Sequence, residues 1–281
     1  MKRIVSAALA FVMAALFAFA PCQMKAEAAS RLTTLKAGRT YNSFDITGDK
    51  RNDKFLIREY GSGDYKNDLR IFVNGKVAYH LQTNTGSHDT FYGTTAKLIT
   101  LGNGKSFLFL SCLGDSDSGP VKAILRYTNG RFVRTVDFNA LTEEYAGICV
   151  PDIKSVSGNT VNVKLYMMSF TTGMSDYTLK YFYKNGKLVQ DSSKTKFLYA
   201  WKGGSKADTF KANRTIKVYT SVNCDKVAFT LKRGNTVKIM SPLRLSSRRV
   251  LYQVKFGNKY GWIIGQNRNS SQMFSDAYYA G

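Results

Sequence analysis

One short loop carries acidic and hydroxyl side chains at the spacing of a calcium-binding loop. In the segment YNSFDITGDKRNDKFLIRE, oxygen-bearing side chains occupy positions 1, 3, 5 and 9, and these are Asp45, Thr47, Asp49 and Asp53. Arg51 stands at position 7, where a backbone carbonyl completes such a loop. This spacing allows one loop to surround a hard cation with several oxygens. The alternative is an Asx-rich turn, in which the aspartates accept hydrogen bonds from nearby backbone N–H groups.

The same loop resembles the FG-GAP calcium repeat of integrin α-type proteins, whose pattern is Asp-x-Asn/Asp-x-Asp-Gly-x-x-Asp. The resemblance implies ligand roles for Asp45, Thr47, Asp49, the Arg51 carbonyl and Asp53. The chain departs from the pattern because Thr47 replaces an acid or amide and Lys50 replaces the usual glycine. Lys50 and Arg51 also place two positive charges beside the ion. We therefore expect either a weak, structural calcium site or the Asx-rich turn.

Residues suited to an enzyme active site are few. The only histidines are His80 and His88, and both precede every cysteine that follows the predicted export signal. A cysteine–histidine wall peptidase would need a helix-borne cysteine with a histidine downstream. Glu143 and Glu144 form the only acidic pair, with Asp152 nearby, and adjacent carboxylates do not face a common substrate as a glycosidase requires. We expect no catalytic residues, and an envelope hydrolase is the less favoured alternative.

Basic and aromatic residues gather near the C-terminus. Residues 208–281 contain 13 Lys plus Arg and three Asp. Arg244, Arg248 and Arg249 lie in one stretch, close in sequence to Tyr252 and Tyr260. A cationic groove lined by aromatic rings suits an anionic glycan or peptide, and in general a single-stranded nucleic acid. The alternative is a solvated basic loop with a core tyrosine.

The sequence around this cluster resembles a bacterial SH3-type (SH3b) domain over about fifty residues, 214–264. The matching motifs are VY at 218–219, LKRGNTVKI at 231–239, YQVK at 252–255 and YGWI at 260–263. In such a module Gly234 permits a tight turn, and Trp262 covers apolar surface at the end of the domain. The resemblance implies a small SH3-like β-barrel that targets the cell wall or serves as a protein-interaction module.

The chain begins with the features of an export signal. A basic start, Met1-Lys2-Arg3, precedes an apolar run from Ile4 to Ala20, and an A-x-A pattern ends at Ala28. The full chain has 41 Lys plus Arg against 19 Asp plus Glu, a net charge of +22. Without residues 1–28 the net charge is +20. We expect a secreted or cell-envelope protein, not integral to the membrane, that is attracted to anionic polymers.

The remaining segments predict an all-β protein. Short apolar stretches alternate with polar residues, and Asn-Gly turns recur at 74–75, 129–130 and 185–186, with spacings of 55 and 56 residues. This period predicts an N-terminal tandem β-repeat, propeller-like or built of sandwiched sheets. The predicted organisation is a signal peptide at 1–28, a β-repeat domain at 29–200, a linker at 201–213, an SH3-like domain at 214–265 and a flexible tail at 266–281.

The composition favours a non-catalytic cell-envelope binding protein. Its SH3-like module would bind an anionic wall polymer or a peptidoglycan peptide, and no specific nucleic acid is expected. The alternative is a secreted interaction or adhesion protein that binds another envelope protein through the β-repeats. Export also permits a disulfide between Cys112 and Cys149, although the sequence does not decide whether it forms.

Overall fold

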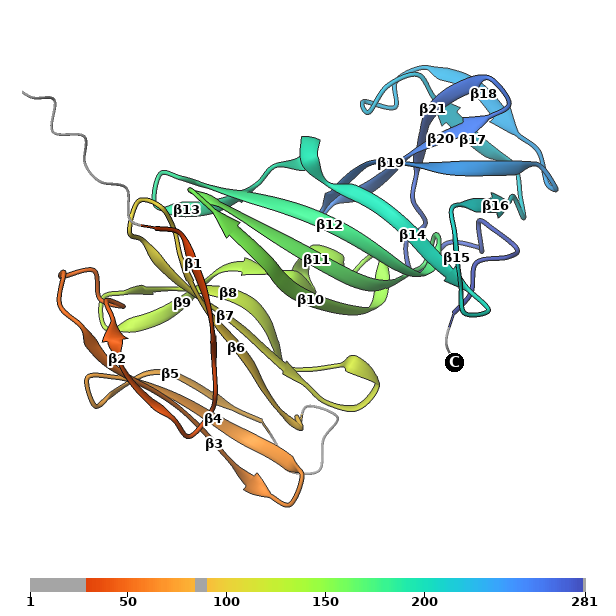
Figure 1. Ribbon diagram of the computed structural model, residues 1–281. Coiled ribbons are helices and arrows are strands. Elements are labelled where there is room, and N and C mark those ends of the chain that lie inside the picture. The colour runs from red at the N-terminus through yellow and green to blue at the C-terminus, as the bar shows by residue number, and fades with distance from the viewer. Residues whose placement is uncertain (1–28, 84–89, 280–281) are drawn as a thin grey trace, which may run out of the picture.

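The protein is built almost entirely of antiparallel strands, as its computed structural model shows (Figure 1). The structure describes residues 29–83 and 90–279. The predicted signal peptide and His88 lie outside these residues. In the described part of the chain one short helix, α2 (Phe138–Thr142), and two 3₁₀ turns, η1 (Asp115–Asp117) and η2 (Ser192–Lys194), interrupt the strands. None of the described helices is long and apolar enough to cross a membrane. The predicted all-β class is confirmed.

Three sheets make up the N-terminal part. The first has the order β2 (Thr40–Phe44), β3 (Asp53–Ser62), β4 (Tyr65–Val73), β5 (Lys76–Gln82). The second has the order β1 (Arg31–Leu35), β6 (Gly93–Thr100), β7 (Ser106–Leu113), β8 (Val121–Thr128), β9 (Arg131–Asp137). The third contains β10 (Ala146–Ser157), β11 (Thr160–Ser169), β12 (Gly173–Lys184), β13 (Lys187–Gln190), β14 (Lys196–Lys202) and β15 (Ser205–Ala207).

Each sheet contains one four-stranded meander of the predicted repeat. The Asn-Gly turns join the third and fourth strands of each meander, namely β4–β5, β8–β9 and β12–β13. Both residues of every turn have positive φ; Asn74 and Gly75, for example, have φ of 52° and 79°. This is the two-residue turn whose twist matches that of the flanking strands, and Asn-Gly adopts it at little cost. The 55- and 56-residue spacing therefore marks a true structural repeat.

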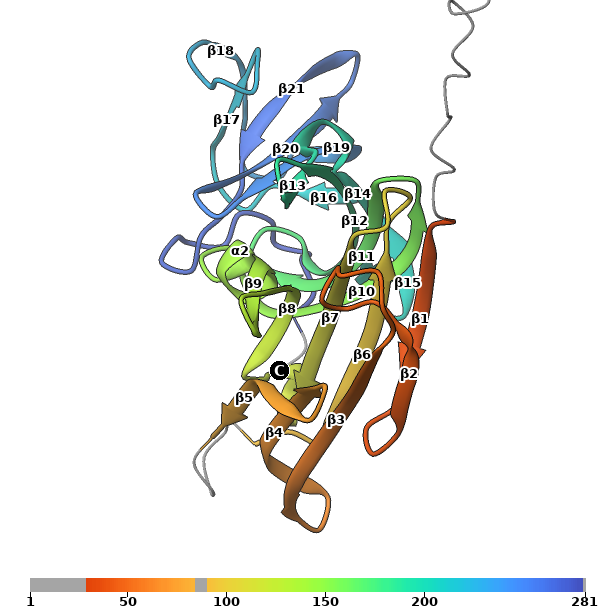
Figure 2. The same ribbon diagram turned by 90° about the vertical axis from the view of Figure 1, so that its left-hand side faces the viewer.

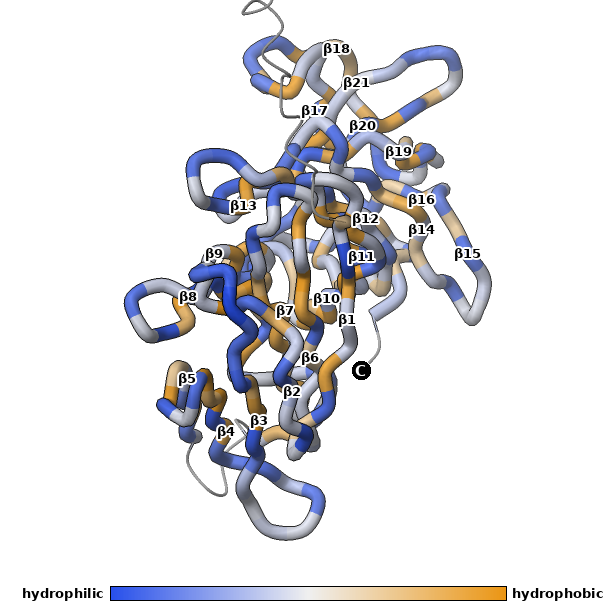
Figure 3. Tube along the Cα trace, turned by 60° about the vertical axis from the view of Figure 1, so that its left-hand side comes forward, coloured by the Kyte–Doolittle hydropathy of each residue, from blue (hydrophilic) through white to orange (hydrophobic). Residues whose placement is uncertain are grey.

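The second sheet is the middle layer of a stack, and both of its faces are buried. Along β7, Leu108 and Leu110 point into a core shared with the first sheet, while Phe107 and Phe109 point into a core shared with the third. This double burial explains the continuous apolar run FLFL, because a strand with one solvated face would alternate. Figure 2 shows the sheets following one another along the molecule, and Figure 3 shows the apolar stretches lying along the strands. The repeats pack as sandwiched sheets.

The C-terminal part forms a further sheet that continues from the third. Its strands are β16 (Thr209–Lys211), β17 (Ile216–Tyr219), β18 (Val227–Leu231), β19 (Thr236–Ser246), β20 (Arg249–Phe256) and β21 (Lys259–Ile264). The order is β19-β20-β21-β17-β18, with β16 also paired to β19. Lys196 of β14 pairs with Pro242 of β19, and this pairing joins the two parts into one sheet. In the residues that the structure describes, this sheet stays open, whereas the SH3 resemblance implies a closed barrel.

Buried aromatic rings hold the C-terminal sheet against the third sheet. The ring of Phe197 lies 5.7 Å from that of Tyr177 and 6.3 Å from that of Tyr252, edge to face in both cases. The Tyr252 hydroxyl is hydrogen-bonded to Ser169 Oγ at 3.0 Å and to the Tyr177 hydroxyl at 3.2 Å. One hydrophobic cluster runs from Phe109 in the second sheet through these rings to Ile263 in β21. The two parts therefore share a core.

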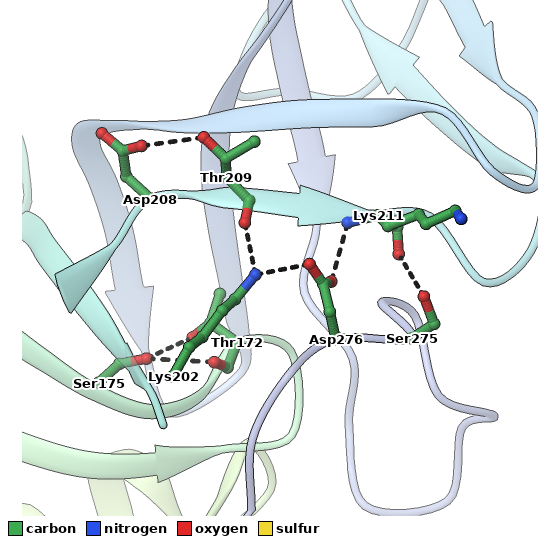
Figure 4. A network of polar contacts seen from close by, with 8 residues as sticks. All are labelled: Thr172, Ser175, Lys202, Asp208, Thr209, Lys211, Ser275 and Asp276. Carbon is green, nitrogen blue, oxygen red and sulfur yellow. Dashed lines mark hydrogen bonds and ion pairs between the residues drawn. The ribbon is translucent and has the colours of Figure 1, made fainter. Parts of the chain in front are cut away.

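The predicted linker is paired structure rather than a free connection. Residues 201–213 contain the end of β14, all of β15, and β16, and Phe210 is fully buried. Lys202 Nζ donates to the carbonyl of Thr209 at 2.5 Å and to Asp276 Oδ2 at 2.6 Å (Figure 4). The adjacent glycines, Gly203 and Gly204, form the tight turn between β14 and β15, with φ of 54° and 83°. The Gly-Gly pair therefore marks the turn of a β-hairpin.

The segment predicted as a flexible tail packs on the protein over its described part. Phe274 is fully buried, and its ring lies 5.2 Å from that of Phe210. Asp276 Oδ1 accepts the backbone N–H of Lys211 at 2.8 Å, and a parallel bridge joins Tyr278 to Gly173 (Figure 4 shows the Asp276 contact). In the sequence, polar residues flank Met273 and Phe274, so the sequence pattern does not show that these two side chains belong to the core. Whether the parts form separate domains stays a prediction.

The cysteines Cys112 and Cys149 do not form a disulfide. Cys112 belongs to the core between the first and second sheets, and Cys149 belongs to the core between the second and third. The middle sheet therefore lies between the two thiols. Burial raises the pKa of Cys112 to about 12 and that of Cys149 to about 11, which keeps both as neutral thiols.

Replacing Phe274 with alanine tests the docking of the C-terminal segment. We expect a loss of about 3–5 kcal/mol in the free energy of unfolding, since the change leaves a cavity against Phe210. Urea denaturation followed by circular dichroism measures it. Ser271→Ala, in an exposed position of the same segment, is the control and should change stability by less than about 0.5 kcal/mol. Equal stability of the two variants would show that the segment does not dock in solution.

Candidate functional site

The predicted calcium loop lies between β2 and β3, and its carboxylates accept hydrogen bonds from the loop itself. Asp45 accepts the backbone N–H groups of Gly48 at 2.6 Å and Lys50 at 2.9 Å. Asp49 accepts the N–H of Arg51 at 2.9 Å. The positive φ of Gly48 and Lys50, 82° and 70°, turns these N–H groups inward. The geometry is that of an Asx-rich turn.

Asp53 anchors this loop from the first position of β3, where it is buried. Its Oδ2 accepts the N–H groups of Ile46 at 2.7 Å and Thr47 at 2.9 Å, and its Oδ1 accepts the side-chain amide of Asn74 at 2.6 Å. Asn74 belongs to the first Asn-Gly turn, so one carboxylate ties the loop to the repeat hairpin. Burial raises the pKa of Asp53, but the hydrogen bonds from Thr47, Asn74 and Ile46 outweigh it and hold the pKa below its usual value.

A calcium ion would compete with these N–H donors for the same oxygens. In the described residues no group of three or more His, Cys, Asp or Glu side chains converges on one point. Calcium binding therefore stays a prediction, and the Asx-rich turn accounts for the positions of Asp45, Asp49 and Asp53 without an ion.

Two of the residues considered for catalysis, His80 and Asp152, lie in ion pairs. His80 Nε2 lies 3.3 Å from Asp68, which also binds Arg70 at 2.7 Å. Asp152 is held by Lys97 at 2.5 Å and by Lys154 at 2.6 Å. Such contacts stabilise carboxylates as anions, and accordingly the pKa values of Asp68 and Asp152 are lowered. For Asp68 the largest cause is the hydrogen bond from Arg70; for Asp152 burial opposes the shift, but the two lysines outweigh it.

The C-terminal sheet has one solvent-facing side that is both cationic and aromatic. Arg244 in β19 stacks over the indole of Trp262 in β21, with the guanidinium carbon 5.6 Å from the ring centroid. Lys255 Nζ in β20 lies 5.3 Å from the ring centroid of Tyr260. Trp262 pairs with Tyr219 of β17, which therefore lies on the same side. We call this surface the arginine face, and its residues are Tyr219, Arg244, Arg249, Lys255, Tyr260 and Trp262.

Strand register decides which of the predicted residues reach this face. Arg244 lies opposite Leu251, and Arg249 lies opposite Ser246, so both arginines share one side of the β19–β20 hairpin. Arg249 also donates to the carbonyl of Val222 at 3.0 Å, which fixes it at one end of the face. Tyr260 is 51% exposed beside Lys255. Arg248 projects from the exposed turn between the strands.

Tyr252 was predicted as a ligand-binding residue, and the structure places it in the core instead. It is fully buried, and its hydroxyl is satisfied by Ser169 and Tyr177. The sequence contains the signal for this outcome, because Tyr252 has the same strand parity as Val250 and Val254. By the same rule Tyr260 and Trp262 share the side opposite to Gly261 and Ile263. Trp262 was expected to cover apolar surface at the end of the domain. It lies on the arginine face instead and is only partly buried.

The positive charges of the arginine face have no acidic partners among the described residues. Lys238 lies opposite Lys255 on this side and pairs with Asp208 at 2.9 Å. No ion pair among the described residues includes Arg244, Arg248, Arg249 or Lys255. Arg244 donates instead to the carbonyl of Ser192 at 2.9 Å. Each guanidinium and the Lys255 ammonium keep donors free for an anion.

No protein-family model, no curated protein and no solved structure matches this chain. The resemblances to an SH3-type domain and to an FG-GAP repeat therefore stay predictions.

Asp53→Asn tests the anchoring role of this carboxylate. The lowered pKa means that the ionised form stabilises the fold at neutral pH and that this stabilisation is lost as pH falls through the lowered pKa. We expect Asp53→Asn to cost about 1–3 kcal/mol at pH 7, because buried N–H groups lose an acceptor. The cost should shrink towards pH 3. Urea midpoints of both proteins at pH 7 and pH 3 measure this, and a cost that does not depend on pH would contradict the assignment.

A calcium titration tests the remaining metal hypothesis. The hypothesis predicts a rise in melting temperature only at millimolar calcium, in the range of about 10⁻⁴–10⁻³ M known for weak extracellular sites. Asp49→Ala should remove that rise, since Asp49 would supply a ligand oxygen. Magnesium at the same concentration is the control. No rise in the unmodified protein would leave the Asx-rich turn as the whole role of the loop.

Proposed function

We propose that this protein is an exported, non-catalytic cell-envelope protein that binds an anionic wall polymer through the arginine face. The observation that carries the proposal is the stacking of Arg244 on Trp262 beside the Lys255–Tyr260 pair, on a solvent-facing side. Within the described residues neither Arg244 nor Lys255 forms an ion pair. The predicted export signal and the net charge of +22 support it. The proposal includes the SH3-like module suggested by the sequence as the binding unit.

The chemistry of the face suits a polymer that alternates sugars or polyols with negative groups. Arginine donates two parallel N–H groups, a geometry that matches phosphate and carboxylate. Aromatic rings beside it offer flat apolar surfaces for the uncharged parts of the polymer. Because Arg244 is already stacked on Trp262, less side-chain entropy is lost when an anion binds.

Replacing Arg244, Arg248 and Arg249 together with serine tests the proposal. Sedimentation of residues 29–281 with purified bacterial cell wall, across a salt series, measures binding. We expect binding to weaken about tenfold at low salt and its salt dependence to flatten, because attraction between separated charges is screened once the Debye length falls below about 10 Å. Circular dichroism and the melting temperature verify that the variant is folded.

A variant of equal charge change provides the matched control. Lys36, Lys54 and Lys76 are exposed in the N-terminal part and take part in no ion pair among the described residues. Their joint replacement with glutamine should change wall binding far less. Equal weakening in both variants would show that binding depends on net charge alone, and this result would contradict binding at the arginine face. Absence of wall binding by the unmodified, folded protein would instead favour the interaction or adhesion alternative.

A further inference from the structure

A second cationic surface lies on the solvent-facing side of the third sheet. Lys164 in β11, Thr178 in β12 and Lys196 in β14 are directly opposite one another, so their side chains share one side. Lys180 follows Thr178 by two residues on that side. A hollow of about 340 Å³ on this surface is lined by Lys154, Asn162, Thr178, Lys180, Lys194 and Lys196. We call this surface the lysine face, and its residues are Lys154, Lys164, Lys180, Lys194 and Lys196.

The lysines of this face differ in how closely an acidic side chain approaches them. Lys154 pairs with Asp152 at 2.6 Å, and Lys164 pairs with Asp176 at 3.0 Å. Among the described residues, Lys180, Lys194 and Lys196 appear in no ion pair.

The Oδ1 atom of Asp191 accepts the N–H and hydroxyl groups of Ser193 at 3.1 and 2.5 Å. These hydrogen bonds, together with the nearby charges of Lys194 and Lys180, lower the pKa of Asp191, so this carboxylate compensates part of the positive charge. Like charges on neighbouring strands repel and destabilise a sheet. Five lysines and three acids, Asp152, Asp176 and Asp191, leave the face with a surplus of positive charge that a bound anion would compensate.

The lysine face and the arginine face are joined. β14 carries Lys196 opposite Pro242 of β19, two residues before Arg244 on the same strand. Arg244 donates to the carbonyl of Ser192 at 2.9 Å, and Ser192 begins the turn η2, which ends with Lys194. Pro242 and Arg244 have the same strand parity, so the solvent-facing side continues across the junction. Positive side chains therefore follow one another from β11 to β20 along one side of a continuous sheet.

The spacing of these charges indicates an extended ligand. Strands lie about 4.8 Å apart, so Lys164 and Lys196, two strands apart in the register, have backbones about 10 Å apart. One small anion cannot reach both faces at once, whereas a chain with negative groups repeated every few ångströms can contact both together. Lysine ammonium groups bind phosphate oxygens as point charges, without the planar geometry that arginine imposes.

We propose that the lysine face is a second segment of one binding strip, which holds an extended phosphate polymer across the β14–β19 junction. This inference rests on the proposed function, in which the arginine face binds the same kind of polymer. The two segments act as linked sites, so their joint affinity for a long chain exceeds that of either face. A short phosphate oligomer occupies one face and gains nothing from the other.

Binding of inorganic polyphosphate to residues 29–281 tests the strip. The probes are chains of about 100 phosphates and tripolyphosphate, measured by calorimetry in a salt series. The variants are Lys180→Gln with Lys194→Gln and Lys196→Gln, and the arginine-face variant Arg244→Ser with Arg248→Ser and Arg249→Ser. Lys36, Lys54 and Lys76 replaced together with glutamine serve as the matched control.

We expect the lysine-face variant to bind the long chain about tenfold more weakly. The plot of log K against log salt should become less steep, by about two units of slope, because fewer phosphates are contacted. The melting temperature of this variant should change little, because the two close ion pairs of the face, Lys154–Asp152 and Lys164–Asp176, are kept. Binding of tripolyphosphate at the arginine face should be unchanged in this variant. Polyglutamate of similar length distinguishes phosphate from carboxylate and should bind less tightly than polyphosphate.

The failures of the two proposals are distinguishable. If the unmodified protein binds no polyanion, both the proposed function and the strip are overturned. If the arginine-face variant loses binding while the lysine-face variant matches the control, the arginine face acts alone and the strip is wrong. If polyglutamate binds as tightly as polyphosphate, the assignment to phosphate is wrong. A fall in melting temperature of the lysine-face variant would show that the lysines serve the fold instead.

Discussion

The buried contact between Phe197, Tyr177 and Tyr252 is the interaction on which the arrangement of this protein depends. Among the described residues, the strand pairing between β14 of the third sheet and β19 of the C-terminal sheet is limited to Lys196 and Pro242. The aromatic rings supply the apolar burial there, and the hydroxyls of Tyr252 and Tyr177 satisfy each other and Ser169 inside the core. A buried hydroxyl without a partner would be costly, so this network fixes one relative orientation of the two sheets.

That orientation also fixes the positions of the charged side chains on the solvent-facing side of the same strands. The residues that alternate with the core side chains include Lys164, Lys196, Arg244 and Lys255, so a rigid core at the junction fixes the pattern of charge on the outer side. Lys164 and Lys196 on one part and Arg244 and Lys255 on the other keep their spacing because the strands that carry them cannot rotate independently. Preorganisation of this kind lowers the entropy lost when a long polymer binds.

Much of the fold could be predicted from local sequence, and the failures share one cause. The Asn-Gly spacing predicted the three meanders because the turn conformation is decided by two residues. The docking of Phe274 against Phe210 could not be predicted in that way, since it depends on residues 64 positions apart in sequence. Tyr252 was misplaced because proximity in sequence was given more weight than strand parity. The lysine face was missed because its members come from four separate segments, which only the sheet register brings together.

The C-terminal segment that contains Phe274 and Tyr278 also affects the order in which the parts of the molecule can fold. Each meander consists of contacts between strands adjacent in sequence, so it can form as soon as its own residues are available. The junction is different, because Phe274 completes the core at Phe210 and Tyr278 bridges to Gly173, more than a hundred residues earlier. Synthesis proceeds from the N-terminus, and chains emerge at about 5–20 residues per second. The N-terminal layers therefore mature first, and the two cationic faces acquire their final alignment only when the end of the chain arrives.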